Sequence, residues 1–252
     1  MKRLSLFGKA LIASGIIAAT MATANATPVL GTAELTVGQI AISFGEVDWN
    51  PSTNPGFDPT PTYGGFKTFV GANTGSFAGP SFAAGIGGFT NGKIQDLSNN
   101  AADGNYFPVG TLSSIQNFFA FDAAPNWKFE AVMVAPGTFP WAPYLLTELG
   151  GNVTATISIS GFICDAGANN FCDPGEDRTR FNSIITAQYT NTSIAAMQAI
   201  VLGGGTLVNN TWSGTLTATA IPGSATVIPE PASIALFGLA LAGLGVMRRR
   251  RA

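Results

Sequence analysis

The sequence predicts an all-β body arranged as an antiparallel β-sandwich or jelly-roll-like domain with one short helix. Two observations carry this prediction. The chain of 252 residues is rich in Gly, Thr, Ser, Asn and Ala, with 31 glycines and 18 phenylalanines, and poor in the Leu, Lys and Glu that fill helices. Several short segments also alternate apolar and polar residues with a period of two, and turn-forming residues separate them. Such segments are expected to be strands with one face toward a core and one toward water.

The clearest strand is predicted at residues 153–163 (VTATISISGFI), where every second residue from Val153 to Ile159 is apolar. In residues 127–134, Lys128 and Glu130 alternate with apolar neighbours and are expected to face solvent. The remaining strands are predicted at residues 34–44, with a bulge near Gly38, and at residues 181–190 and 211–221.

One segment departs from this alternation. Residues 193–202 (SIAAMQAIVL) are mostly good helix formers, with Thr192 or Ser193 as the N-cap and three glycines, 203–205, to end the helix. Residues 50–65 contain four prolines and are predicted to form a loop, as are residues 71–88.

The N-terminus has the pattern of a secretory signal peptide. Basic residues occupy positions 2, 3 and 9, an apolar stretch follows from residue 10 to about residue 22, and Ala24 and Ala26 supply the small residues of a cleavage site. Cleavage after Ala26 is expected, with the secretion machinery as partner. A retained N-terminal membrane helix is the weaker alternative because the apolar run is short.

The C-terminus combines three ordered elements: a Pro-Glu-Pro triplet, an uncharged run at residues 232–247 and a block of arginines. The prolines hold the acidic residue in a stiff extended stretch. The apolar run is short for a bilayer of about 30 Å, so snorkelling arginines would have to complete a transmembrane helix. The arginines would keep the end of the chain cytoplasmic. The residues of the triplet and the block are Pro229, Glu230, Pro231, Arg248, Arg249, Arg250 and Arg251.

This tail resembles the PEP-CTERM sorting signal of Gram-negative envelope proteins. The resemblance implies that an exosortase-type membrane enzyme recognises the triplet and processes the tail during export. It also implies a surface or matrix protein in a biofilm or exopolysaccharide setting. The chain would then divide into a signal peptide (1–26), a β-rich extracytoplasmic body (27–221), a spacer (222–228) and the sorting tail (229–252). A plain tail-anchored membrane helix is the alternative.

Charge narrows the function of the body. Between the two targeting segments, thirteen acidic residues stand against five basic ones, which leaves a charge of about −8. Nucleic acid is therefore excluded as a partner, because phosphate binding needs clustered Lys and Arg. The chain has no histidine, which removes Ser-His-Asp catalysis and His-based metal sites. We expect no enzyme and no cofactor. The carboxylates that remain as candidates for a glycosidase pair show no sign of convergence: Asp48, Asp122, Glu130 and Glu148.

The two cysteines, Cys164 and Cys172, lie eight positions apart in a chain predicted to be exported, where disulfides persist. We predict a bond between them. The acidic loop that contains them, residues 164–180, offers oxygen ligands suited to Ca²⁺, but its spacing matches no calcium motif and Arg178 and Arg180 can neutralise its acids. A disulfide-closed hairpin loop without metal is the favoured interpretation.

A proline-framed aromatic cluster at residues 139–144 (FPWAPY) offers one further candidate site. Trp141 and Tyr144 would stack on sugar rings if they are exposed, which would make envelope polysaccharide a partner. The alternative is that they plug the end of the body, the commoner fate of such residues.

Overall fold

The computed structural model describes residues 28–36, 39–49, 63–79, 82, 89–101, 106–139, 142–166, 178–209 and 211–221. Most of these residues form antiparallel strands in two sheets. The main sheet contains β1 (Gly31–Thr36), β4 (Tyr63–Phe69), β5 (Phe89–Gln95), β7 (Phe119–Phe121), β8 (Trp127–Val134), β9 (Leu145–Leu149), β10 (Asn152–Asp165), β11 (Thr179–Tyr189) and β13 (Ser213–Ala220). The second sheet contains β2 (Ile40–Ser43), β3 (Glu46–Trp49), β6 (Leu97–Ser98) and β12 (Leu207–Asn209).

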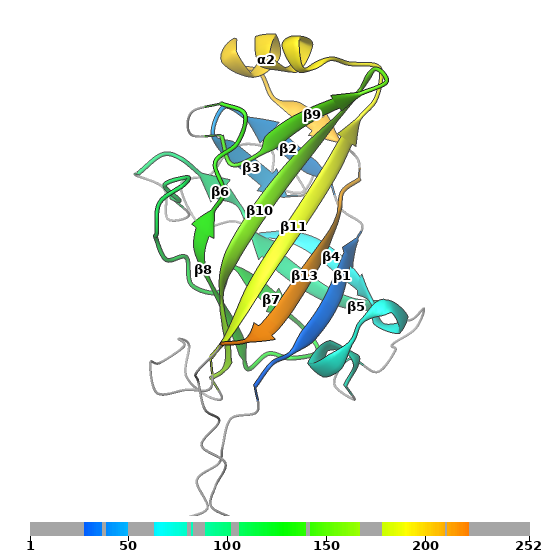
Figure 1. The fold of residues 1–252 in the computed structure, drawn as a ribbon, viewed down its shortest axis with the longest axis vertical. Helices are drawn as coiled ribbons and strands as arrows, with labels where there is room; N and C mark the ends of the chain where they lie inside the picture. Colours follow the sequence, from blue (N-terminus) through cyan, green and yellow to red (C-terminus); the bar gives the residue numbers. More distant parts are fainter. Residues whose placement is uncertain are drawn as a thin grey trace, which may run out of the picture.

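The main sheet curls into a nearly closed, barrel-like shape rather than the expected sandwich (Figure 1). Its strands follow the order β7-β5-β4-β1-β13-β11-β10-β8, and β9 pairs with the other half of β10. The two ends of this order meet, since the Phe118 N–H donates to the Phe129 carbonyl at 2.9 Å and Ile115 bridges Ala131. The sequence prediction is therefore right about antiparallel β structure with one short helix and wrong about how the main sheet is arranged.

A β-bulge helps this sheet to curl. The pairing of β10 with β8 shifts register between Ser160 and Gly161, and bulges increase twist and bend the strand. The bulge requires a glycine, because a Cβ at Gly161 would lie 1.9 Å from the Glu130 carbonyl oxygen. Periodicity alone did not show this local bend.

Four of the five predicted strands are confirmed, as β8, β10, β11 and β13. The prediction of one strand at residues 34–44 is wrong. That segment holds two strands, β1 in the main sheet and β2 in the second. The physical reason is the change of phase within it: Leu35 is buried in one alternation, and Ile40 and Ile42 belong to the next.

The predicted helix is confirmed as α2 (Ile194–Leu202), which lies at the end of the body drawn at the top of Figure 1. Ser193 is its N-cap, with its Oγ accepting the Ala196 N–H at 3.2 Å. At the other end, the Gly203 N–H donates to the Ala199 carbonyl at 3.2 Å. Helix α2 contacts β9 and β12.

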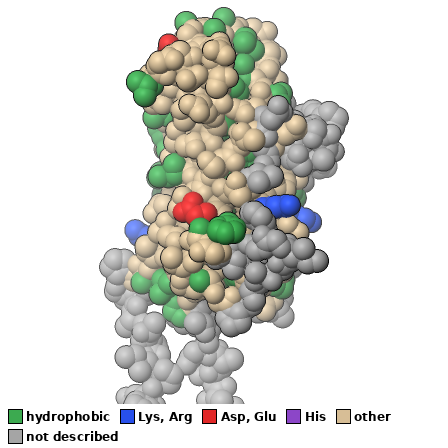
Figure 2. Space-filling view, turned by 90° about the vertical axis from the view of Figure 1, so that its right-hand side faces the viewer, with side chains coloured by type: hydrophobic (Ala, Val, Ile, Leu, Met, Phe, Trp, Pro, Cys, Tyr) green, Lys and Arg blue, Asp and Glu red, His purple; other side chains and the backbone are tan. Residues whose placement is uncertain are grey.

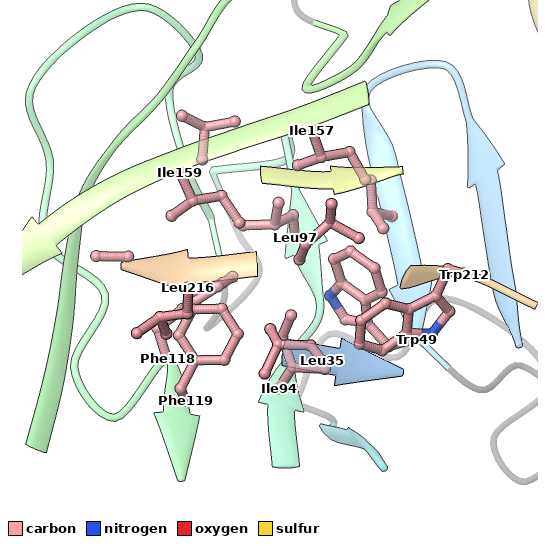
Figure 3. Packing of buried hydrophobic residues seen from close by; sticks show 14 of the residues in the cluster. Leu35, Trp49, Ile94, Leu97, Phe118, Phe119, Ile157, Ile159, Trp212 and Leu216 are labelled. Atoms are coloured by element: carbon pink, nitrogen blue, oxygen red, sulfur yellow. The ribbon is translucent and has the colours of Figure 1, made fainter. Parts of the chain in front are cut away.

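The second sheet packs on the inner side of the main sheet and shares its hydrophobic core. Trp49 of β3 and Trp212, just before β13, have ring centroids 5.2 Å apart. Figure 3 shows Leu97 of β6 close to Ile157 of β10 in the same packing. Part of the body thus has two facing layers, as a sandwich would.

Phenylalanine rings fill the interior of the barrel-like part. Phe129 packs against Phe121 and Phe181 with centroid separations of 5.4 and 5.7 Å. Phe77 and Phe82 are also fully buried, although residues 71–88 were predicted to be a loop. Phe77 belongs to η2 (Gly75–Ala78), a short 3₁₀ turn that follows η1 (Val70–Ala72). The predicted loop therefore contributes side chains to the core.

Within the described ranges, no helix is both long enough and apolar enough to cross a membrane. The predicted signal peptide and the predicted transmembrane helix at 232–247 lie outside those ranges.

Candidate functional site

The start of β1 and the end of β13, where the described part of the body begins and ends, lie side by side. Gly31 at the start of β1 pairs with Ala218 near the end of β13, whereas Thr36 pairs with Ser213 at the opposite end of the same two strands. The last described residue, Ile221, follows β13 directly. Figure 1 shows this end of the strands at the bottom and α2 at the top. Anything attached through either terminus is therefore connected at the end away from α2.

Comparison with known proteins gives a match for the C-terminal tail. A family model described as the PEP-CTERM protein-sorting motif matches residues 227–251. The chain carries a PEP-CTERM sorting motif. The match covers the Pro-Glu-Pro triplet, the apolar run and the arginines, which confirms the resemblance seen in the sequence. No curated protein and no solved structure matches the chain. The PEP-CTERM motif supports export and an exosortase as processing partner, and it assigns no role to the body.

All the residues predicted to direct export and sorting lie outside the described residues. These are the cleavage-site residues Ala24 and Ala26, the triplet 229–231 and the arginines 248–251. Trp141 of the aromatic cluster also lies outside them. Their roles stay predictions from sequence.

Tyr144 does not have the exposure that sugar stacking requires. Its side chain is 0% exposed, and its hydroxyl donates to the Ser43 carbonyl of β2 at 2.8 Å. Its ring also packs edge-on against Phe139, with centroids 6.2 Å apart. Burial raises the pKa of Tyr144 above its usual range. The ring thus fastens the second sheet to the loop before β9, which is the plugging role that the sequence left as the alternative.

The cysteine loop is described only at its two ends. Cys164 is buried in β10 and is not a free thiol. Its expected partner Cys172 lies outside the described residues, and the bond between them stays a prediction. Most of the acidic residues of the suggested calcium loop lie outside as well. Among the described residues, no group of three or more His, Cys, Asp or Glu side chains is placed to hold a metal ion.

The strand pattern predicted that Glu130 faces solvent, but in the structure its carboxylate is paired. The Arg178 guanidinium donates to Glu130 Oε2 at 2.5 Å, and the Ser114 hydroxyl donates to Oε1 at 2.8 Å. The Arg178 guanidinium carbon also lies 4.1 Å from the centre of the Phe162 ring. This cluster joins residue 178, at the far end of the acidic loop, to the outer side of β8 and β10.

The other carboxylates do not converge on Glu130. Glu148 Oε2 accepts the Ile194 N–H at 2.8 Å, so this side chain caps the start of α2. Asp122 is an exposed residue directly after β7. Asp48 lies in β3 and is buried. Among the described contacts, none joins two of the four candidate carboxylates.

Asp48 instead lies close to a carboxyl group that the sequence analysis missed. Asp48 and Asp96 are 3% and 4% exposed, and Asp96 Oδ1 accepts the Trp49 N–H at 2.8 Å. Burial raises the pKa of Asp48 to about 6. Burial, followed by the charge of Asp48, raises the pKa of Asp96 to about 7, although the Trp49 hydrogen bond opposes the increase. The one sign of this burial in the sequence is that Asp96 lies directly before the apolar Leu97 and two positions after the apolar Ile94.

These two acids can take up protons near neutral pH, but their burial separates them from a polymeric substrate. Asp48 Oδ1 is buried without a hydrogen-bond partner. An ionised carboxylate in that position is costly, which is the physical cause of the raised pKa. The pair therefore affects how stability depends on pH.

The body also has a surface hollow of about 310 Å³ on the outer side of β4, β5 and β7, next to the start of β8. Tyr63 and Trp127 contribute aromatic surface, Lys93 and Lys128 contribute ammonium groups, and Asn117 contributes an amide. Lys128 Nζ donates to the Pro125 carbonyl at 3.3 Å. Aromatic, amide and ammonium groups together suit a sugar that carries a carboxylate.

Proposed function

We propose that this chain is an exported, non-enzymatic protein of the cell envelope or extracellular space. In this proposal, the C-terminal tail holds it in the inner membrane until an exosortase processes it, and the body is then displayed at the surface or in a biofilm or exopolysaccharide matrix. The observation that carries the proposal is the PEP-CTERM match at residues 227–251.

The way the body meets the tail is compatible with this role. Strand β13 pairs with β1 on one side and β11 on the other, so the tail follows a strand that is held on both edges. The spacer at residues 222–228 then separates the body from the triplet. A body anchored in this way keeps its fold when the tail is cut, because the strand before the spacer is fixed by pairing that does not involve the tail.

The chemistry of the body supports a non-enzymatic role. The chain lacks histidine, Glu130 is paired with Arg178, and Asp48 and Asp96 are buried. These residues therefore lack the accessible acid–base pair that hydrolysis of a polysaccharide requires.

Mass spectrometry of the C-terminal peptide tests the sorting proposal. The protein is purified from the envelope and from the medium of its native host. We expect a terminus near residues 229–231 with the arginines missing. A matched variant, Glu230→Gln, keeps the length and apolarity of the tail and should accumulate unprocessed. An intact arginine block on every wild-type molecule would instead indicate a plain membrane anchor.

Carbohydrate binding is a second candidate function, favoured by the hollow beside Tyr63 and Lys93. The exported protein should be retained on an immobilised acidic polysaccharide and lose retention in Lys93→Ala. Trp141→Ala tests the aromatic cluster in the same assay. Equal retention of wild type and both variants would dispose of this candidate.

A further inference from the structure

The end of the body that carries α2 exposes an unusual amount of apolar surface. We define the distal cap as β9, α2, β12 and the turns next to them. Leu149 is 87% exposed and Leu202 is 64% exposed. Other large apolar side chains of the cap are also exposed: Leu145, Ile200 and Val208. Figure 2 shows hydrophobic side chains at this upper end as well as lower on the same face, whereas most of the charged side chains in view lie lower down.

Helix α2 itself does not have the composition of a solvent-covered helix. Its sequence, IAAMQAIVL, contains Gln198 as the one polar residue. Met197 and Val201 are its buried residues, so its outer side leaves Ala and Ile in water. A helix that is apolar all round is normally buried on all sides. The cap therefore has the composition of an interface rather than of a free surface.

The distal cap is also almost uncharged. Residues 181–221 contain no charged residue, and residues 142–163 contain Glu148 alone, which caps the first turn of α2. The rest of the body is acidic, so two copies repel each other least when they meet through their caps. A membrane surface suits the cap poorly, because membrane-binding helices present Lys and Arg beside aromatic anchors, and α2 has neither.

We propose that the distal cap is a self-association surface through which two copies of the body bind cap to cap. A two-fold arrangement would place the same apolar residues of each copy against those of the other, as in symmetric dimers. The cap lies at the opposite end of β1 and β13 from the segments that attach to the membrane. It is therefore available both before and after the tail is processed. This inference goes beyond the proposed function and does not depend on whether the body is displayed at the cell surface.

Sedimentation velocity of the exported protein tests the proposal over a range of about 1–100 µM, which brackets ordinary dimer affinities. The double variant Leu149→Glu/Leu202→Glu places charges at the two most exposed of the large apolar residues of the cap. We expect wild type to shift from monomer to dimer and the double variant to associate at least about tenfold more weakly. The matched control is Leu112→Glu, which changes a leucine that is 81% exposed and lies outside the cap. It should dimerise like wild type.

A second variant pair guards against a general effect of added charge or lost folding. Leu149→Gln/Leu202→Gln is uncharged and should also weaken the dimer. At a protein concentration where wild type is monomeric, its unfolding temperature should equal that of wild type. The proposal is overturned if wild type stays monomeric throughout, if the dimer survives both double variants, or if Leu112→Glu disrupts it equally. It is also overturned if the cap captures a host protein of different sequence in place of a second copy. C-terminal mass spectrometry of the same samples reports tail processing separately.

Discussion

The interior of the main sheet and the distal cap are both apolar, but they differ in what covers them. The interior is lined by phenylalanine rings such as Phe119, Phe129 and Phe181, all fully buried and all in ring-to-ring contact. The cap presents Leu149 and Leu202 to solvent. The same kind of side chain therefore stabilises the fold in one region and remains available for binding in the other.

This comparison shows which substitutions should report on folding and which on association. In the interior, each ring is held by neighbours from several strands, so truncation leaves a cavity. In the cap, truncation of a side chain leaves no cavity and only reduces the apolar area that is exposed to water. Matched pairs of substitutions, one from each kind of environment, test this difference between the two regions.

The largest effect is expected for Leu216→Ala in β13, compared with Leu149→Ala in the cap. Leu216 is 0% exposed and belongs to the core, so its truncation should cost about 3 kcal/mol of unfolding free energy. For a body of this size, the midpoint temperature of thermal unfolding should fall by roughly 6–12 °C. Leu149→Ala should change unfolding by less than about 0.5 kcal/mol. Similar losses for the two variants would contradict the division into buried interior and exposed cap.

A smaller loss is expected for Gly161→Ala at the bulge. The added methyl group would press on the Glu130 carbonyl and on the Phe181 ring, for a cost of about 2 kcal/mol. Gly65→Ala in β4 is the matched control, because nothing lies within 4 Å of a Cβ at that position. Denaturant unfolding of both variants measures the difference. If Gly161→Ala unfolds like wild type, the bulge is not a close approach of two backbones.

Much of this fold could be predicted from local patterns. The alternation at residues 153–163 predicted β10, and the run from Ser193 to the glycines predicted α2, with Thr192 or Ser193 as its N-cap. Such elements depend on neighbours a few residues away. The PEP-CTERM tail was recognisable for the same reason, since its three elements are adjacent in the sequence.

The features that the sequence did not reveal depend on distant contacts. The closure of the main sheet depends on the Phe118–Phe129 hydrogen bond and on the bulge where Ser160 and Gly161 face β8. The sequence left Tyr144 either exposed or buried, and the burial depends on its hydroxyl, which donates to the Ser43 carbonyl 101 positions away. Asp96 and Asp48 meet in the same way, through strands that are far apart in the chain. Periodicity contains no information on such pairs.

The buried acids of the interior make the stability of the fold depend on pH. The pKa of Asp96 is about 7 in the folded protein and near 3.8 when the chain is unfolded. Between these values the folded state binds a proton that the unfolded state has lost, so stability falls as pH rises through this window. Asp48 acts in the same direction, because burial raises its pKa to about 6.

Asp96→Asn mimics the protonated acid and should raise the unfolding free energy at pH 8, where the wild-type carboxyl group is ionised. Each unit by which folding raises the pKa corresponds to about 1.4 kcal/mol. Near pH 4 the variant should match wild type. Thermal unfolding across pH 4–8 measures the effect. The exposed acid Asp122 supplies the control as Asp122→Asn, which should follow the wild-type profile. An Asp96→Asn profile parallel to wild type would show that Asp96 is ionised throughout the range.

The smallest effect is expected within the cap itself, for Ser193→Ala. The Ser193 hydroxyl accepts the Ala196 N–H, and loss of an N-cap costs about 1 kcal/mol. Because α2 is covered on one side only, the loss should appear as faster hydrogen exchange of the α2 amides, with little change in global unfolding. Thr192→Ala is the matched control, since the sequence left either residue as the cap. If Thr192→Ala accelerates exchange as much as Ser193→Ala, the hydroxyl of Ser193 is not the specific N-cap. If Ser193→Ala lowers the global unfolding free energy by the full cost of the lost cap, the helix is part of the same cooperative unit as the interior. The contrast between the two regions would then fail.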